Sequence, residues 1–102
     1  MANRLTLHDT MTKLLGSQNV YYQPPASTKM KYPAIVYSRS NINEKYANNA
    51  IYSRYNSYDI IVIDNLPDNP VIEKLLDLPY CSHSRHYVSD NLHHDVLKLS
   101  KF

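Results

Sequence analysis

Residues 54–64, RYNSYDIIVID, contain an unbroken run of four β-branched apolar side chains at residues 60–63, followed by Asp64. A strand with one solvated face alternates apolar and polar residues, whereas an unbroken apolar run is typical of a strand buried on both faces. Residues 54–64 therefore predict the central strand of a sheet. Upstream, residues 33–40, PAIVYSRS, alternate and are rich in β-branched and aromatic side chains, which predicts a second strand beside it.

The segment after the central strand, residues 65–79 (NLPDNPVIEKLLDLP), predicts a turn followed by a short helix. Asp68 or Asn69 can accept hydrogen bonds from the first amides of this helix, and Pro70 fits a first turn that needs no N–H donor. Turn formation and capping also account for Asp64 and Asp68, so these two carboxylates are not interpreted as a catalytic pair.

The two ends of the chain add a first helix and a hairpin. Residues 3–16, NRLTLHDTMTKLLG, predict an amphipathic helix that ends at Gly16. Its apolar face is expected to contain Leu5, Leu7, Met11, Leu14 and Leu15. Residues 20–21 are a candidate for a short edge strand, and residues 80–89 and 92–102 predict two antiparallel strands joined at residues 90–91.

Together these segments predict one α+β domain over residues 1–102. The expected order is helix, two strands, helix, two strands. Strand pairs with helices between them predict an antiparallel or mixed sheet of about four strands, with both helices packed on one face.

The polar, asparagine-rich stretch at residues 40–54 predicts either a long hairpin arm or a long loop. A connection of this length inside a compact domain is often functional, or becomes ordered only on a partner. Tyrosine, with its apolar ring and polar tip, is also favoured in protein–protein contacts. The candidate interface residues are therefore Tyr46, Asn48, Asn49, Tyr52 and Arg54.

Composition argues against several classes of function. One glycine among 102 residues disfavours both glycine-rich phosphate loops and tight hairpins of type I′ or II′. A net charge of +2, with basic and acidic residues interspersed, provides no footprint for nucleic-acid binding. The single cysteine excludes an internal disulfide and fits a reducing compartment. The sequence has neither an apolar run long enough to span a membrane nor the apolar core of a signal peptide. We therefore expect a soluble cytoplasmic product that has no membrane partner.

Residues 81–96, CSHSRHYVSDNLHHDV, contain the only cysteine and four of the five histidines. Strict alternation along a strand would place His83 and His86 on opposite faces, and His93 and His94 likewise. At most one histidine from each strand could then share a face, so neither a metal site nor a cofactor is expected. Thiol catalysis needs a nearby base, an oxyanion hole and usually a helix N-terminus or a strained turn, whereas Cys81 follows Pro79 at the start of a strand, where a small apolar residue commonly packs.

The same hairpin has a structural interpretation. Asp90 and Asn91 are turn formers that can satisfy their own backbone. Arg85 is expected to pair bidentately with Asp95 or Asp90 on the facing strand. Catalytic residues are therefore not expected in this hairpin.

Residues 30–97 resemble the tail-terminator, or tail-completion, proteins of long-tailed bacteriophages. The resemblance is carried by spaced residues that core packing alone does not dictate: Pro33 to Tyr37, Asn48, Tyr58, Val62, Asp64, Pro67, Asp68, Leu78, Pro79, Cys81, Arg85, Tyr87, Asp90, Asn91, Leu92 and His94. The chain departs from that pattern at His83, where an aromatic residue is expected, and at His93, where asparagine is expected. Its last strand is also poorer in aromatic residues.

The resemblance implies assembly rather than catalysis, in a tail-terminator-like fold. Such proteins form a homo-oligomeric ring, commonly of six copies, at the head-proximal end of the tail tube. The ring stops tube polymerisation and joins the tail to the connector proteins of the head, while DNA passes through the lumen without specific binding. The expected location is the virion tail, after assembly in the host cytoplasm. Structural roles are implied for Asp64, Asp68, Arg85, Asp90, Asn91 and His94.

Two alternatives remain. A head-closure or head–tail connector component would also form a ring and would present a similar sequence. A metal-dependent or thiol-dependent enzyme would instead use the histidines or Cys81.

Overall fold

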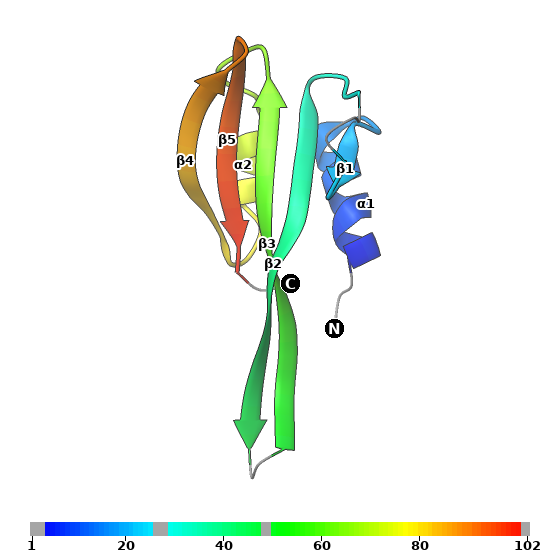
Figure 1. Ribbon diagram of the computed structural model, residues 1–102, viewed down its shortest axis with the longest axis vertical. Helices are drawn as coiled ribbons and strands as arrows, with labels where there is room; N and C mark the ends of the chain where they lie inside the picture. The colour runs from blue at the N-terminus through cyan, green and yellow to red at the C-terminus, as the bar shows by residue number, and fades with distance from the viewer. Residues whose placement is uncertain (1–3, 26–28, 48–49, 101–102) are drawn as a thin grey trace.

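The computed structural model describes residues 4–25, 29–47 and 50–100, and shows an α+β fold with a mixed five-stranded sheet (Figure 1). The elements are α1 (Arg4–Leu15), β1 (Val20–Tyr22), β2 (Ala34–Ala47), β3 (Ala50–Asp64), α2 (Val71–Leu76), β4 (Cys81–Ser89) and β5 (Leu92–Leu99). The α+β class is confirmed. The sheet has one strand more than the expected four because the candidate edge strand at residues 20–21 forms, as β1.

The strands lie in the order β1-β2-β3-β5-β4, with β1 parallel to β2 and the other neighbours antiparallel. β3 is therefore the middle strand, as its apolar run predicts. Ile60 and Val62 are 0% and 1% exposed in the core cluster, and Ile63 on the opposite face is 7% exposed. Burial on both faces explains why this strand needs no polar alternation.

Both helices lie on one face of the sheet (Figure 1). Leu7 and Met11 of α1 and Leu75 of α2 are fully buried there, in a cluster with side chains from β2, β3 and β5. α1 ends at Gly16, whose φ of 74° lies in the left-handed region that favours glycine. The expectation that Leu5 extends the buried face is wrong, since Leu5 is 62% exposed. Two residues before Leu7, it lies about 200° around the helix.

Three tyrosines contribute to this core rather than to the surface. Tyr37 and Tyr58 are 1% and 2% exposed, and the ring centres of Tyr22 and Tyr37 are 4.9 Å apart. The Tyr37 hydroxyl is 2.7 Å from Nδ1 of His8 in α1. Burial raises the pKa of both Tyr37 and Tyr58 above the ordinary value of 10.0. The high tyrosine content thus partly reflects packing between helix and sheet.

β2 and β3 continue well past the body of the sheet as a two-stranded ribbon, which we call the arm (residues 41–47 and 50–57). β5 pairs with β3 only over Tyr58–Asp64, and β1 pairs with β2 only over residues 35–37. Beyond these points β2 and β3 pair with each other (Figure 1). The radius of gyration, 14.7 Å, exceeds the roughly 13 Å of a compact chain of this length. Of the two alternatives for residues 40–54, the described residues 41–47 and 50–54 therefore fit the hairpin arm.

Among the helices of the described residues, none combines the length and the apolar character needed to cross a membrane.

Candidate functional site

A β-bulge in β4 decides where the histidines point. His83 is aligned with Leu97 of β5, but Arg85 is aligned with Val96, so Ser84 is one extra residue in β4. An extra residue shifts the alternation of side chains by one position. His83 and His86 consequently lie on the same face of the sheet, and the prediction that they face apart is wrong.

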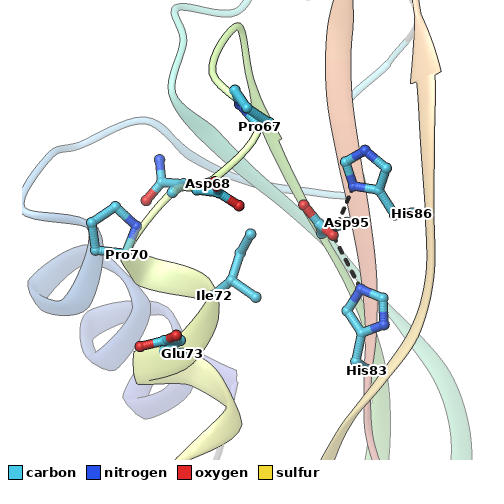
Figure 2. Close-up of a pocket in the computed structure, with 9 residues that line it drawn as sticks. Pro67, Asp68, Pro70, Ile72, Glu73, His83, His86 and Asp95 are labelled. Atoms are coloured by element: carbon cyan, nitrogen blue, oxygen red, sulfur yellow. Dashed lines mark hydrogen bonds and ion pairs between the residues drawn. The ribbon is translucent and has the colours of Figure 1, made fainter.

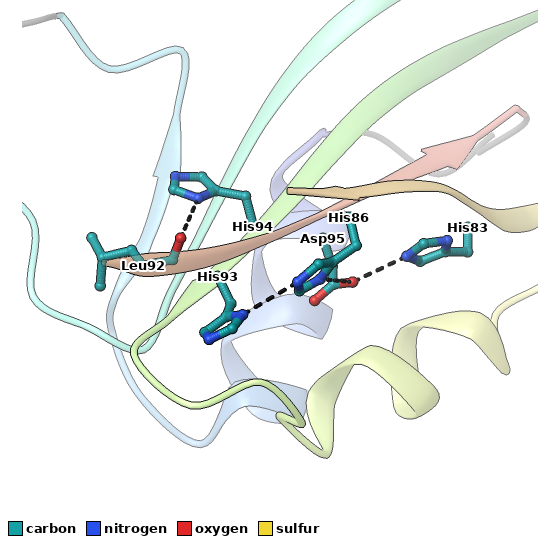
Figure 3. A network of polar contacts seen from close by, with 6 residues as sticks. All are labelled: His83, His86, Leu92, His93, His94 and Asp95. Carbon is teal, nitrogen blue, oxygen red and sulfur yellow. Dashed lines mark hydrogen bonds and ion pairs between the residues drawn. The ribbon is translucent and has the colours of Figure 1, made fainter. Parts of the chain in front are cut away.

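Asp95 of β5 joins these two histidines (Figures 2 and 3). Its Oδ1 lies 3.0 Å from Nε2 of His83 and 2.9 Å from Nδ1 of His86. His93 of β5 extends the network, with Nδ1 3.2 Å from Nε2 of His86. Three histidines therefore share one face with a carboxylate that is only 7% exposed. The expectation of at most one histidine from each strand is also wrong.

The chemistry of the network fixes its proton donors. A carboxylate only accepts, so His83 donates from Nε2 and His86 donates from Nδ1. In a neutral His86, Nε2 then accepts a hydrogen bond from Nδ1–H of His93. Oδ1 of Asp95 thus accepts hydrogen bonds from the rings of His83 and His86, and the ring of His93 donates to His86. This network ties β4 to β5.

His94 and Arg85 lie on the opposite face, around Tyr87. The imidazole of His94 stacks on the Tyr87 ring at 4.6 Å between centres, and its Nδ1 donates to the carbonyl of Leu92 at 3.0 Å. The Arg85 guanidinium lies 5.5 Å from the centre of the same ring. The expected pairing of Arg85 with Asp95 is wrong, because the carboxylate faces the helices and its partners are histidines.

The turn at Asp90 and Asn91 adopts positive φ values of 52° and 63°. Two such residues between the paired Ser89 and Leu92 match a type I′ hairpin turn. The expectation that a chain with one glycine would avoid this turn is wrong here. Aspartate and asparagine tolerate the left-handed region because their short polar side chains bond locally.

Asp64 organises the segment between β3 and α2. The carboxylate is 6% exposed; Oδ1 accepts from the Leu66 amide at 3.3 Å and Oδ2 accepts from Nδ2 of Asn69 at 2.7 Å. Oδ1 of Asn69 in turn accepts from the Val71 amide at 2.9 Å. Of the two capping candidates, Asn69 bonds the first helical amide, whereas Asp68 is exposed.

A groove of about 590 Å³ lies between this segment and β4 (Figure 2). α2, next to this segment, is only six residues long, and the residues of β4 from Ser82 onward are exposed. Its lining consists of Pro67, Asp68, Asn69, Pro70, Ile72, Glu73, His83, His86 and Asp95.

The histidines and Cys81 show no arrangement for metal chemistry. Within residues 4–25, 29–47 and 50–100, histidine, cysteine, aspartate and glutamate form no group of three or more that could hold a metal ion. Cys81 is half-buried and packs against the core cluster at the start of β4. Burial raises the pKa of its thiol, which lowers the fraction of reactive thiolate.

Three of the five candidate interface residues belong to the described part of the arm. Tyr46, Tyr52 and Arg54 lie on its two strands, where the structure describes the backbone but not these side chains. Asn48 and Asn49 lie outside the described residues.

Sequence reasoning missed the edge position of β4. Every residue from Ser82 to Ser89 is exposed. The sequence contains no direct signal for this position, since strand order depends on pairing between distant segments.

In comparisons with known proteins, no family model, no curated protein and no solved structure matches this chain.

Proposed function

We propose that this protein is a structural component of a bacteriophage tail, a tail terminator with a tail-terminator-like fold. In this role, copies of the chain form a ring, commonly of six, on the head-proximal end of the tail tube. The ring stops tube growth and offers a surface to the head connector. The proposal starts from the sequence resemblance of residues 30–97, and the observation that carries it is the arm.

The arm meets the rest of its own chain at its base, where the Ser57 hydroxyl donates to the carbonyl of Ser100 at 2.7 Å. On the N-terminal side of Tyr58 in β3, the described strands β2 and β3 have only each other as strand neighbours. A two-stranded hairpin is marginally stable in water, whereas a third strand or a packed surface makes it stable. An arm of seven residues on the β2 side extends about 24 Å at 3.4 Å per residue. Such an element is suited to binding another subunit.

An arm on one side and a receiving surface elsewhere make a head-to-tail contact. Contacts of this type close into a ring when the rotation between neighbours is suitable. A ring explains how a chain of 102 residues spans the end of a much wider tube. It also requires no specific binding of DNA, in keeping with interspersed charges and a net charge of +2.

The histidine network favours assembly over covalent catalysis. His83 and His86 both donate to Asp95, and the groove beside them is lined without serine, threonine, cysteine or lysine. A His–Asp pair that activates a nucleophile needs that nucleophile within hydrogen-bond reach. The network is better explained as a link between β4 and β5.

Negative-stain electron microscopy of the chain mixed with tail-tube protein of the same phage tests the proposal. The expected result is a ring at one end of each tube and tubes that no longer elongate. A variant with residues 43–55 replaced by an Asn-Gly turn, which joins the register pair Ile42 and Asn56, should not cap tubes. Leu5→Ser, at an exposed position of α1, is the matched control and should cap normally.

Two outcomes would redirect the proposal. Uncapped tubes together with binding to the portal or adaptor would favour the head–tail connector role. Particles that remain monomeric and ignore both tubes and connectors would refute an assembly function.

A further inference from the structure

β4 is an open edge of the sheet. β4 is the outermost strand on one side of the sheet, and its nine residues have β5 as their only strand neighbour in the described part of the chain. Ser89 and Leu92 flank a two-residue turn and form its hydrogen-bonded pair. Because hydrogen-bonded pairs alternate along an antiparallel ladder, the backbone of Tyr87 also bonds to β5. The backbone N–H and C=O of Val88, between them, point away from β5. Val88 is 57% exposed.

Unpaired edges invite the addition of another strand, and proteins usually protect them with proline, lysine or very short strands. The opposite edge strand, β1, is protected in this way because it is three residues long. β4 contains neither proline nor lysine, and its one irregularity is the bulge at Ser84. Past the bulge, residues 85–89 remain a regular strand.

The arm has the complementary property. Residues 50–56 of β3 have β2 on one side and no described strand on the other, since pairing with β5 begins at Tyr58. The arm leads away from the body, whereas β4 runs along the body beyond β5 (Figure 1). With β5 between β3 and β4, the arm does not reach β4 of its own chain. An arm that pairs with β4 would therefore belong to a second copy.

We propose that the open edge of β4 receives the arm of a second copy of this chain, which extends the five-stranded sheet across the subunit boundary. The partner is a copy of the same protein, and backbone hydrogen bonds provide the contact, as in other cases of strand addition. This inference rests on the proposed function, for which it supplies the head-to-tail contact. Each subunit gives an arm on one side and offers β4 on the other.

The small area of this contact predicts that two subunits alone associate weakly, whereas a closed ring is more stable. Seven residues of strand, about 24 Å long on a sheet about 10 Å thick, cover about 240 Å² on each partner, or roughly 500 Å² in total. Stable isolated interfaces bury more than about 1,000 Å². A single arm contact is therefore expected to be concentration-dependent, while ring closure gives every subunit two contacts.

Amide hydrogen exchange on the wild-type chain is the first test, because it needs no variant. On raising the concentration from about 10 µM to about 500 µM, the Val88 amide should exchange at least about tenfold more slowly. The amide of Tyr87, already bonded to β5, should change much less. Rings that form without added protection at Val88 would overturn the inference and leave the terminator proposal standing.

Mixing two variants tests the direction of the contact. Val88→Pro removes the outward N–H of β4 and keeps the arm, whereas the variant with residues 43–55 replaced by Asn-Gly keeps β4 and loses the arm. Neither should self-associate in sedimentation velocity, but an equimolar mixture should form a heterodimer. Val88→Thr, which retains the N–H, is the control and should assemble like the wild type.

Self-association of the armless variant would instead indicate pairing between two β4 edges and would contradict the proposal. Assembly through arm and β4 without any binding to tubes would leave this inference intact and refute the terminator function.

Discussion

Replacing Asp95 by alanine should destabilise the fold more than any other change in the histidine network. The substitution removes the acceptor for both His83 and His86. Hydrogen bonds to a charged group contribute about 1.5–3 kcal/mol each when their loss leaves a buried partner unsatisfied. Here the side chains of His83 and His86 are 39% and 38% exposed, so water replaces much of each bond. We expect a loss of about 2 kcal/mol in total.

Urea unfolding followed by circular dichroism at neutral pH measures this loss. For a chain of about 100 residues, 2 kcal/mol corresponds to a decrease of roughly 10 °C in melting temperature. Asp95→Asn keeps one accepting oxygen and should lose about half as much. Arg85→Ala is the matched control from the other face: Arg85 is exposed and should change the free energy of unfolding by at most about 0.5 kcal/mol.

The reasoning would be refuted if Asp95→Ala melted like the wild type, or if Arg85→Ala were the more harmful of the two. The first result would mean that the network contributes nothing beyond what water provides. The second would restore the ion pair that sequence alone predicts for Arg85.

Three further outcomes follow from the contacts of single residues. Asp64→Ala should cost about 2–3 kcal/mol in urea unfolding, because it removes the acceptor of two bonds, and exposed Asp68→Ala should stay within about 0.5 kcal/mol. Gly16→Ala should lower the free energy of unfolding by about 1 kcal/mol, because alanine is strained at a φ of 74°. An added Cβ has no atom within 4 Å, so no steric clash contributes, and an unchanged melting temperature would contradict this prediction. Burial raises the pKa of Tyr37 and Tyr58, so the unfolded state loses these protons first, and the urea midpoint should fall as pH rises above 10.0.

The central strand and first helix could be predicted because their signals are local. In the apolar run at residues 60–63, Ile60, Val62 and Ile63 are buried, as such a run predicts without knowledge of the other strands. The helical spacing of Leu7 and Met11 likewise fixes one face without reference to the sheet. β1 was harder to predict, because three residues have little periodicity and are held by parallel pairing with β2, which is distant in sequence.

The histidine site could not be predicted because its geometry depends on one inserted residue. Alternation assigns faces correctly until a bulge, and then every later side chain of that strand moves to the other face. Ser84 carries no local signal for a bulge, since it is neither glycine nor proline. Composition alone could not separate tyrosines that contact a partner from those that pack internally, and Tyr37 and Tyr58 fill the space between helix and sheet.

The bulge and the open edge belong to one arrangement. By turning His86 toward Asp95, the bulge gives β4 side-chain links to β5 as well as its backbone ladder. An edge strand that receives a partner must keep its position while its outer hydrogen bonds form and break, and a strand held only by its ladder would fray at an open edge. The same network lies on the helix face, away from the outward amide of Val88. β4 can therefore be held firmly on its inner side while its outer side stays available for a second copy.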